Sequence, residues 1–354
     1  MPQSGTVHNI TGTGMRNWTA ACVILAFLAG MVSTSPAFSA EPRKPGEYPP
    51  TADSLPQPGV PKGKLIGPLE FHSKIIADTV RRYWIYVPAK YDAKSPPNLL
   101  VFQDGQRAIN PQGPLNIPVV LDNLIAKGDI PQTLGIFITP GNSGTEHYPE
   151  GLAPSGCVGA ACNCTGYACT GNPNHRAQEY DALSDAYTRM LIDELMPEVA
   201  KSYKFTDDPK KRAIGGTSSG AICAWTVAWH RPDAFGNVIS MIGSYTSIGY
   251  HPATATTPMI PGGDTYPGLI RKNPIRPIRI FLQDGTADLN NEHGNWHLAN
   301  EQMLSALQWA NANADEKKVP GARYDVRYEW GDGAHSDVHG GWLLPGILRW
   351  MFGK

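Results

Sequence analysis

The sequence predicts an α/β protein with a mostly parallel, doubly wound sheet and helices on both faces. Two observations lead to this prediction: short apolar runs end in glycine or other turn residues, and amphipathic runs lie between them. Continuous apolar strands bounded by turns are typical of a sheet covered on both sides. Strands that alternate with helices favour right-handed crossovers and parallel pairing. We therefore expect one catalytic domain over residues 63–354.

The expected strands are short, and most are continuously apolar, such as "NLLVFQDG" at 98–105. The run "RRYWIYVP" at 81–88 differs because it alternates and is rich in residues that favour strands. The expected set covers 81–88, 98–105, 134–141, 212–216, 238–244, 278–285 and 324–333.

Helical patterns fall between these strands. The stretch 179–203 places Leu183, Tyr187 and Leu191 on one apolar stripe. Pro197 must kink or restart this helix, because proline lacks the backbone N–H of a helix interior. The other expected helices are 117–128, 221–229, 296–312 and 346–352.

The N-terminus has the pattern of a signal peptide over residues 1–39. Arg16 precedes an apolar run from 20 to 32, and the small residues of "AFSA" favour cleavage after Ser39. The apolar run is short for a membrane span, although an uncleaved anchor is the alternative. Met15 is an alternative start of the chain. We expect a periplasmic or secreted protein with no stable membrane span after cleavage.

A proline-rich stretch at 40–62 follows, and we expect it to be extended with no core of its own. The formal net charge of −1 and the absence of a lysine and arginine run offer no electrostatic case for nucleic acid. His293 and His297 have a spacing that suits a metal on a helix, but no third ligand is visible. We expect no metal and no cofactor.

Four cysteines crowd into one short stretch: Cys157, Cys162, Cys164 and Cys169. In an oxidising compartment this cluster predicts two disulfides in a loop inserted at 157–169, and the sequence does not decide their pairing. A four-cysteine zinc site is the alternative, although the spacing is not that of paired C-x2-C motifs. Cys223 remains as a buried free thiol.

The stretch "GGTSSG" contains G-x-S-x-G over residues 216–220, with a predicted strand before it and a predicted helix after it. This context is that of a nucleophile elbow, in which a sharp turn exposes a serine at the carboxyl edge of the sheet. The glycines two residues away on each side avoid collisions with neighbouring backbone. Ser218 is therefore the expected nucleophile. A glycine-rich turn with a serine N-cap is the alternative.

A serine nucleophile needs a base, and in this architecture an acid and then a histidine follow it along the chain. Asp288 is the expected acid, with Glu292 as the second choice, while Asp284 lies closer to the strand and is expected to hold the turn. His335 follows a G-D-G-A turn and is the expected base. His339 is expected to line the pocket or cap the last helix.

Two backbone N–H groups are expected to form the oxyanion hole. Ser219 starts the helix after the elbow, and Gln106 lies in the loop after an early strand, where Gly105 lets the chain pass close. The expected reaction is acyl transfer. His335 deprotonates Ser218, the serine attacks an ester carbonyl, and water then releases the acid.

The chain resembles the enterochelin-esterase-like and esterase-D-like group of α/β-hydrolases, which includes feruloyl and acetyl-xylan esterases. The resemblance covers about residues 65–354 and rests on "LLVFQDGQ", "EYDALSDAYTRMLIDELMPEV", "RAIGGTSSGA", "FLQDGTADLNN" and "GAHSDVHGGWLLPGILRW". It implies the α/β-hydrolase fold, the triad Ser218, Asp288 and His335, and a role near the site for the motif "EYD", which begins at Glu179. Charge at a helix N-terminus is the alternative for Glu179.

Two features depart from this family pattern. Ala221 stands where the family often has a second glycine, and the cysteine-rich insertion is not a family feature. Together the motifs predict a serine esterase acting on a small-molecule or polysaccharide ester, and the family resemblance implies plant-polymer or siderophore esters as its substrates. The alternatives are a non-catalytic carbohydrate- or partner-binding protein on a hydrolase scaffold, and an acyltransferase or peptidase with the same triad.

The cysteine pattern makes a direct prediction about thiols. Thiol titration of the exported, denatured and unreduced protein should find one free thiol, that of Cys223, because the other four cysteines pair. Five free thiols, or zinc bound in stoichiometric amount, would contradict the disulfides.

Overall fold

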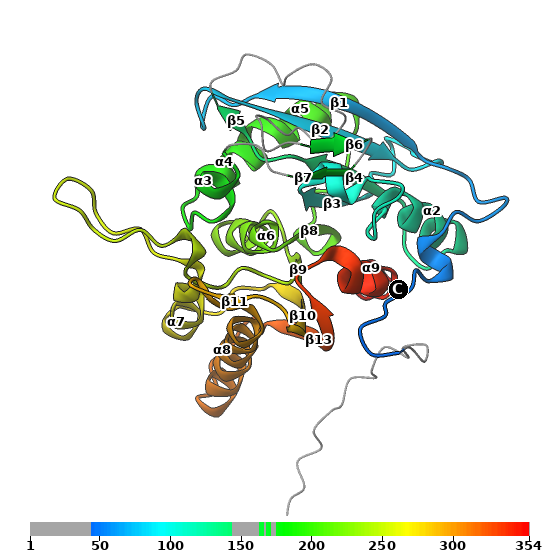
Figure 1. Cartoon of the computed structure of the whole chain (residues 1–354). Coiled ribbons are helices and arrows are strands. Elements are labelled where there is room, and N and C mark those ends of the chain that lie inside the picture. Colours follow the sequence, from blue (N-terminus) through cyan, green and yellow to red (C-terminus); the bar gives the residue numbers. More distant parts are fainter. Residues whose placement is uncertain (1–43, 144–162, 166–167, 171–174, 354) are drawn as a thin grey trace, which may run out of the picture. The chain divides into compact units, whose positions relative to one another are not determined.

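A mixed sheet runs through the described part of the chain in the order β1–β2–β4–β3–β8–β9–β10–β13 (Figure 1). The computed structural model describes residues 44–143 and 175–353, and the backbone alone of 163–165 and 168–170. The strands of the sheet are β1 Lys64–His72, β2 Thr79–Val87, β3 Asn98–Gln103, β4 Thr133–Ile138, β8 Arg212–Thr217, β9 Asn237–Met241, β10 Arg279–Ala287 and β13 Asp325–Ala334. The strands from β4 to β13 pair in parallel, whereas β1 and β2 are antiparallel. The predicted mostly parallel sheet is confirmed.

Helices cover both faces of this sheet (Figure 1). On one face lie α2 Ile117–Lys127 and α9 Asp337–Phe352, and on the other lie α6 Ser219–His230 and α8 Trp296–Glu316. Smaller elements are η1 Ala52–Ser54, α1 Gly105–Ala108, β5 Asn142–Ser143, β6 Asn163–Thr165, β7 Ala168–Thr170, α3 Arg176–Tyr180, η3 Pro209–Lys211, η4 Ser247–Gly249, η5 Gly263–Thr265, α7 Tyr266–Lys272, β11 Asn290–Asn291 and β12 Gly294–Asn295. None of the helices that the structure describes is long and apolar enough to cross a bilayer.

The central strands are mostly apolar because both of their faces are buried. Every residue of β3, β4, β8 and β9 is buried. Successive side chains of a strand point to opposite faces, so Leu99 and Val101 of β3 join the cluster that contains Ile222 and Trp225 of α6. Each fully buried side chain of this kind contributes about 1.5–3 kcal/mol of transfer free energy.

The first strand was not predicted from the sequence. β1 lies at the edge of the sheet, and most of its residues are exposed or half-buried. An edge strand of this kind needs few apolar residues, because solvent covers much of its surface. β1 pairs with the next strand, β2, through the turn at 73–78, but the sequence of β1 itself carries no clear strand pattern.

The helix around Pro197 neither ends nor restarts there. α4 Ala186–Arg189 continues as the π-helical stretch η2 Met190–Leu195 and then as α5 Met196–Ser202. Proline cannot donate the i→i−4 hydrogen bond, and its ring crowds the carbonyl four residues earlier. A π-helical turn just before the proline changes the hydrogen-bond register, so the chain continues as one helix.

The proline-rich segment packs on the catalytic domain, and Pro42–Lys354 form one compact unit. The Tyr48 ring is buried and stacks on His339 with 4.1 Å between ring centroids. Asn123 of α2 donates its Nδ2 to the carbonyl oxygens of Asp53 and Leu55 at 2.8 and 2.9 Å. The segment thus contributes Tyr48 to the core of the catalytic domain.

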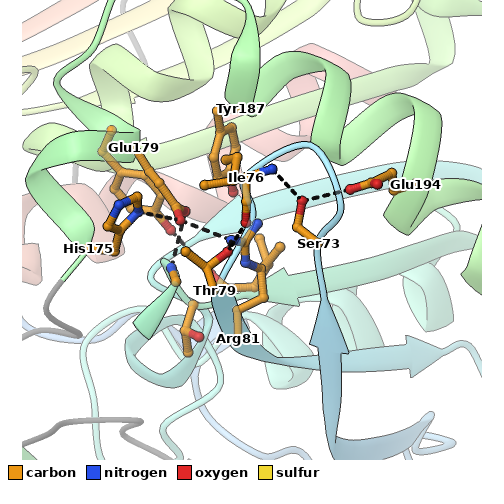
Figure 2. Close-up of polar contacts among 12 residues, drawn as sticks. Ser73, Ile76, Thr79, Arg81, His175, Glu179, Tyr187 and Glu194 are labelled. Atoms are coloured by element: carbon orange, nitrogen blue, oxygen red, sulfur yellow. Dashed lines mark hydrogen bonds and ion pairs between the residues drawn. The ribbon is translucent and has the colours of Figure 1, made fainter. Parts of the chain in front are cut away.

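A buried ion pair ties β2 to α3 (Figure 2). Arg81 Nη2 lies 2.9 Å from Glu179 Oε1, and both side chains are almost fully buried. Glu179 also accepts the N–H of Gly141 at 3.1 Å and contacts His175 Nδ1 at 3.0 Å. Arg81 donates to the Thr79 hydroxyl at 2.7 Å. This carboxylate therefore holds three segments together.

A second set of contacts in Figure 2 fixes the turn between β1 and β2. The Ser73 hydroxyl donates to Glu194 of η2 at 2.7 Å and accepts the N–H of Ile76 at 2.8 Å. The Thr79 hydroxyl donates to the carbonyl of Ile76 at 2.6 Å. These bonds attach the antiparallel edge of the sheet to the helix that covers it.

Substitution of Glu179 by glutamine should destabilise the protein by about 3–5 kcal/mol, because it leaves the Arg81 charge buried without a counter-ion. Urea unfolding monitored by tryptophan fluorescence measures this change. Glu292→Gln is the matched control, since that side chain is 81% exposed, and its effect should stay within about 0.5 kcal/mol. Equal unfolding midpoints for the two variants would show that the buried ion pair does not stabilise the fold.

Candidate active site

Ser218 occupies the sharp turn between β8 and α6. Its backbone has φ 59° and ψ −124°, a conformation that a residue other than glycine adopts only when its surroundings enforce it. Backbone hydrogen bonds supply this enforcement: the Ser218 N–H donates to Met241 at 3.0 Å, and the Ser218 carbonyl accepts from Ser244 at 3.2 Å. The structure therefore has the strained elbow that the motif predicts.

His335 lies between β13 and α9 and connects the serine to an acid. Its Nε2 is 2.9 Å from Ser218 Oγ, and its Nδ1 is 2.5 Å from Asp288 Oδ1. Because an ionised Asp288 accepts a hydrogen bond from the Nδ1–H group, the lone pair of Nε2 faces the serine hydroxyl. The imidazole is 21% exposed, whereas the Asp288 carboxylate is fully buried. Three residues from the ends of three strands thus meet at one edge of the sheet.

The two carboxyl groups next to His335 have opposite pKa shifts. Burial disfavours the charge of Asp288, but hydrogen bonds from His335 and Asp284 outweigh it and hold the pKa of Asp288 below its ordinary value. Burial, together with the hydrogen bond and the charge of Asp288, raises the pKa of Asp284 to about 9. Burial and the contact with His335 thus favour a negative charge on Asp288 over one on Asp284.

Ser244 and Trp296 complete the surroundings of Ser218, and no motif in the sequence had pointed to Ser244. The Ser244 hydroxyl is 3.2 Å from Ser218 Oγ and accepts the indole N–H of Trp296 at 3.1 Å. The Trp296 ring stands edge-on to His335, with 5.6 Å between centroids. Because the indole occupies a lone pair of Ser244, the Ser244 hydroxyl hydrogen is available to Ser218. Its position just after β9, at the carboxyl edge of the sheet, is the one signal that could have identified Ser244.

The two predicted oxyanion donors lie in the first turns of helices. Ser219 and Gln106 are both buried, and each lies in the first turn of a helix, where backbone N–H groups have no intrahelical acceptor. A Cβ at Gly105 would lie 2.4 Å from the carbonyl carbon of Phe137, so only glycine at this position lets the loop pass this close to β4. The hydroxyl of Ser219 lies beside Asp181.

Two ion pairs hold the loop that contains Gln106 in place, and no sequence pattern had indicated the residues that form them. Asp104, at φ 52°, receives two hydrogen bonds from Arg176 at 3.0 and 2.7 Å. Burial opposes the charge of Asp104, but Arg176 outweighs it and lowers the pKa of that carboxyl. Arg107 in turn donates twice to Asp337, at 3.0 and 2.7 Å, two residues after His335. These ion pairs thus link the loop after β3 to the segment that carries His335.

The "EYD" motif lies beneath the site and supports it. The Tyr180 hydroxyl accepts the N–H of Asp104 at 3.3 Å, and Asp181 lies beside the Ser219 hydroxyl. Burial raises the pKa of Asp181. Each residue of the motif thus holds a different segment, while Glu179 pairs with Arg81.

None of the three predicted pocket residues contacts the serine or the histidine. Glu179 is buried in the Arg81 ion pair, and Glu292 is exposed on the β11–β12 hairpin. His339 is 2% exposed, and its Nδ1 meets Gln283 Nε2 at 2.8 Å. His339 therefore packs α9 against β10 and Tyr48, because α9 begins at Asp337 and its first turn faces inward.

The cysteine predictions fall largely outside the described residues. Cys157 and Cys162 lie outside the described residues. For Cys164 and Cys169 only the backbone is described, and these two residues are opposite each other in the antiparallel pair β6–β7. Cys223 is buried with a free thiol, and burial raises its pKa. Within the described ranges, no three His, Cys, Asp or Glu side chains gather as metal ligands.

Substitution of Gly216 by alanine should destabilise the elbow by about 1–3 kcal/mol, because the new Cβ would lie 2.4 Å from the backbone carbonyl group of Gly220. Chemical unfolding measures the change. The matched control is Gly268→Ala in α7, where no heavy atom lies within 4 Å of the new Cβ. It should leave stability unchanged or raise it by up to about 1 kcal/mol. A Gly216→Ala protein as stable as the wild type would mean that the elbow can accommodate a side chain at this position.

Comparison with known proteins places this geometry among esterases. The iron(III) enterobactin esterase of Dickeya dadantii is 26% identical over 283 residues, which cover 76% of this chain and 53% of the relative. The chain thus spans about half the length of this curated relative.

Solved structures share the α/β-hydrolase fold. The enterobactin esterase of Shigella flexneri, solved in the presence of enterobactin, is 20% identical with a TM-score of 0.57, covering 88% of this chain and 62% of that one. The ferulic acid esterase of Anaeromyces mucronatus, solved with ferulic acid, is 16% identical with a TM-score of 0.55, covering 85% and 94%. A family model described as "Putative esterase" matches residues 76–337, more than half of the chain, and the protein therefore belongs to this esterase family.

Proposed function

We propose that the protein is a serine esterase that hydrolyses carboxylic esters through an acyl-enzyme. The observation that carries this proposal is the hydrogen-bonded series Asp288–His335–Ser218, with its acid buried and its serine on a strained elbow. Membership of the esterase family supports the same reaction. A mere structural turn would not require a buried carboxylate aligned with a histidine and an accessible hydroxyl.

In the acylation step, His335 Nε2 takes the proton of Ser218 Oγ as the oxygen attacks the ester carbonyl carbon. Asp288 stabilises the imidazolium that forms and keeps the ring in its orientation. The N–H groups of Ser219 and Gln106 donate hydrogen bonds to the carbonyl oxygen and stabilise the negative charge that develops on it. His335 then returns the proton to the leaving alcohol, and the acyl group stays on Ser218.

Deacylation repeats these roles with water. His335 removes a proton from water, which attacks the acyl carbon, and the same proton returns to Ser218 Oγ as the carboxylic acid leaves. The Ser244 hydroxyl, 3.2 Å from Ser218 Oγ, assists both steps by hydrogen bonding to that oxygen when it carries partial charge.

The proposed substrates are siderophore esters or feruloyl and acetyl esters of plant polymers. The names of the relatives, which describe enterobactin and ferulic acid esterases, support the siderophore and feruloyl esters, and the acetyl esters rest on the family resemblance alone. A panel of p-nitrophenyl, feruloyl, acetylated-xylan and enterobactin esters separates these classes by their relative kcat/KM.

The protein should be exported and should lose its leader, because residues 1–39 have the charge, apolar run and small-residue site of a signal peptide. Intact-mass analysis of the exported protein should give a chain that starts near Ala40. Recovery of the full-length chain from the cytoplasm would contradict export.

Ser218→Ala and His335→Ala should each lower kcat by on the order of 10³-fold or more, because triad members act as a unit. Asp288→Asn should cost somewhat less, since the histidine stays in place with the wrong tautomer. Ester hydrolysis measures these losses, and a fluorophosphonate should label Ser218 one-to-one.

Two control variants accompany this test. Ser219→Ala should be mild, because only its backbone is proposed to donate to the oxyanion. Glu292→Gln should leave kcat unchanged. Labelling of Ser219, or a larger loss in Glu292→Gln than in Asp288→Asn, would overturn the residue assignment.

A further inference from the structure

We propose that Asp284 is a positioning residue that stays protonated and donates a hydrogen bond to the outer oxygen of Asp288. The candidate site would then hold four linked side chains: Asp284, Asp288, His335 and Ser218. The catalytic consequence of this inference rests on the proposed function. The protonation state and the hydrogen bond are properties of the folded protein and can be tested without any substrate.

Asp284 is buried without a cation among the described residues to balance a negative charge. It lies near the end of β10 and is fully buried. Its Oδ1 accepts the N–H of Gly285 and its Oδ2 accepts Asn300 Nδ2, both at 2.6 Å. In the described part of the chain, Asp284 forms no ion pair with any lysine, arginine or histidine. A buried carboxylate without a cation is costly, and a proton removes that cost.

Asp288 lacks a donor on one side. Its Oδ1 binds His335 Nδ1 and the N–H of Leu289, both at 2.5 Å. Its Oδ2 is buried, and no N–H or hydroxyl group of the described residues donates to it. The Asp288 N–H donates to the Gly285 carbonyl at 3.0 Å, so a tight turn brings Asp288 back beside Asp284, and the two carboxyl groups interact. Because a carboxyl group donates only when it is protonated, protonated Asp284 supplies the missing donor.

The charges around the pair decide which carboxyl keeps the proton. Beyond Asp288 stands His335, which stabilises a negative charge on Asp288. From α8 the facing group is the uncharged amide of Asn300, and on β13 the residue paired with Asp284 is Trp330. Accordingly, the pKa of Asp284 is raised to about 9 by burial and by Asp288, whereas that of Asp288 is lowered. The proton therefore belongs to Asp284.

The proton on Asp284 makes the alignment of Asp288 dependent on pH. Below pH 9, neutral Asp284 holds Asp288 in line with His335. As the pH rises through about 9, Asp284 loses its proton, the hydrogen bond disappears, and a second negative charge faces Asp288. Because the pKa in the folded state lies above the unfolded value of 3.8, the stability contribution of the proton is fully present below pH 3.8 and is lost as the pH rises through about 9.

Infrared difference spectroscopy tests the protonation state directly. The spectrum of the wild type minus that of Asp284→Asn at pH 7 should contain the carbonyl band of a protonated carboxylic acid, and this band should disappear near pH 9. In the control Asp315→Asn, whose side chain is 68% exposed, the difference should contain only carboxylate bands. A carboxylate band in place of the acid band for Asp284 at pH 7 would overturn the proposal.

The rate of inactivation by a fluorophosphonate, measured against pH, tests the positioning role. The wild-type rate should fall above about pH 9, whereas Asp284→Asn, which keeps a neutral N–H donor, should lose this fall and stay within about 10-fold of wild type at pH 7. Asp284→Ala should be up to about 100-fold slower, because Asp288 and His335 lose their alignment. The Asp315→Asn control should match the wild type.

An unchanged alkaline fall in Asp284→Asn would refute the positioning role. Circular dichroism establishes whether Asp284→Ala is folded, and if it is not, the pH profile of Asp284→Asn decides alone. If even the wild type fails to react at Ser218, the proposed esterase function is wrong, and the infrared band then still decides the state of Asp284.

Discussion

The backbone reversal at Ser218 is the constraint around which the rest of the site is arranged. A positive φ at a serine costs on the order of 1–3 kcal/mol, so the surroundings must supply more than that. They do so through buried β8 and α6, through the glycine at 216, and through backbone bonds to Met241 and Ser244. The strain keeps the hydroxyl above the sheet edge, where loops from neighbouring strands can reach it.

Those loops place acidic side chains at a buried edge of the sheet, and a neighbouring group balances or suppresses the charge of each. Asp104 is matched by Arg176, and Glu179 by Arg81. Asp284 lacks a cation, and its raised pKa keeps it neutral. Asp288 keeps its negative charge, and it faces His335. A single buried carboxylate beside the imidazole favours the imidazolium that acyl transfer requires.

The supporting contacts also explain why distant segments matter to the site. The Asp104–Arg176 and Arg107–Asp337 pairs join the loop after β3 to α3 and to the start of α9. Tyr48, from the proline-rich segment, stacks on His339 of the same helix. The His335 loop is therefore held from several sides, although the residues that hold it are far apart in the chain.

Local patterns in the sequence determined the order of the central strands and helices, the strand–serine–helix turn, and the positions of Asp288 and His335 after later strands. These features are readable because continuous apolar strands and glycine-flanked turns follow from short-range backbone sterics and burial. Tertiary structure alone decided the partners of buried polar groups. Glu179 and His339 lie in the interior, paired with Arg81 and Tyr48, whereas Asp104, Arg176 and Ser244 belong to the surroundings of the site. The partners of these side chains are far away in the sequence, so only folding brings them together. The edge strand β1 and the packing of Tyr48 belong to the same class, since each depends on a surface that another part of the chain provides.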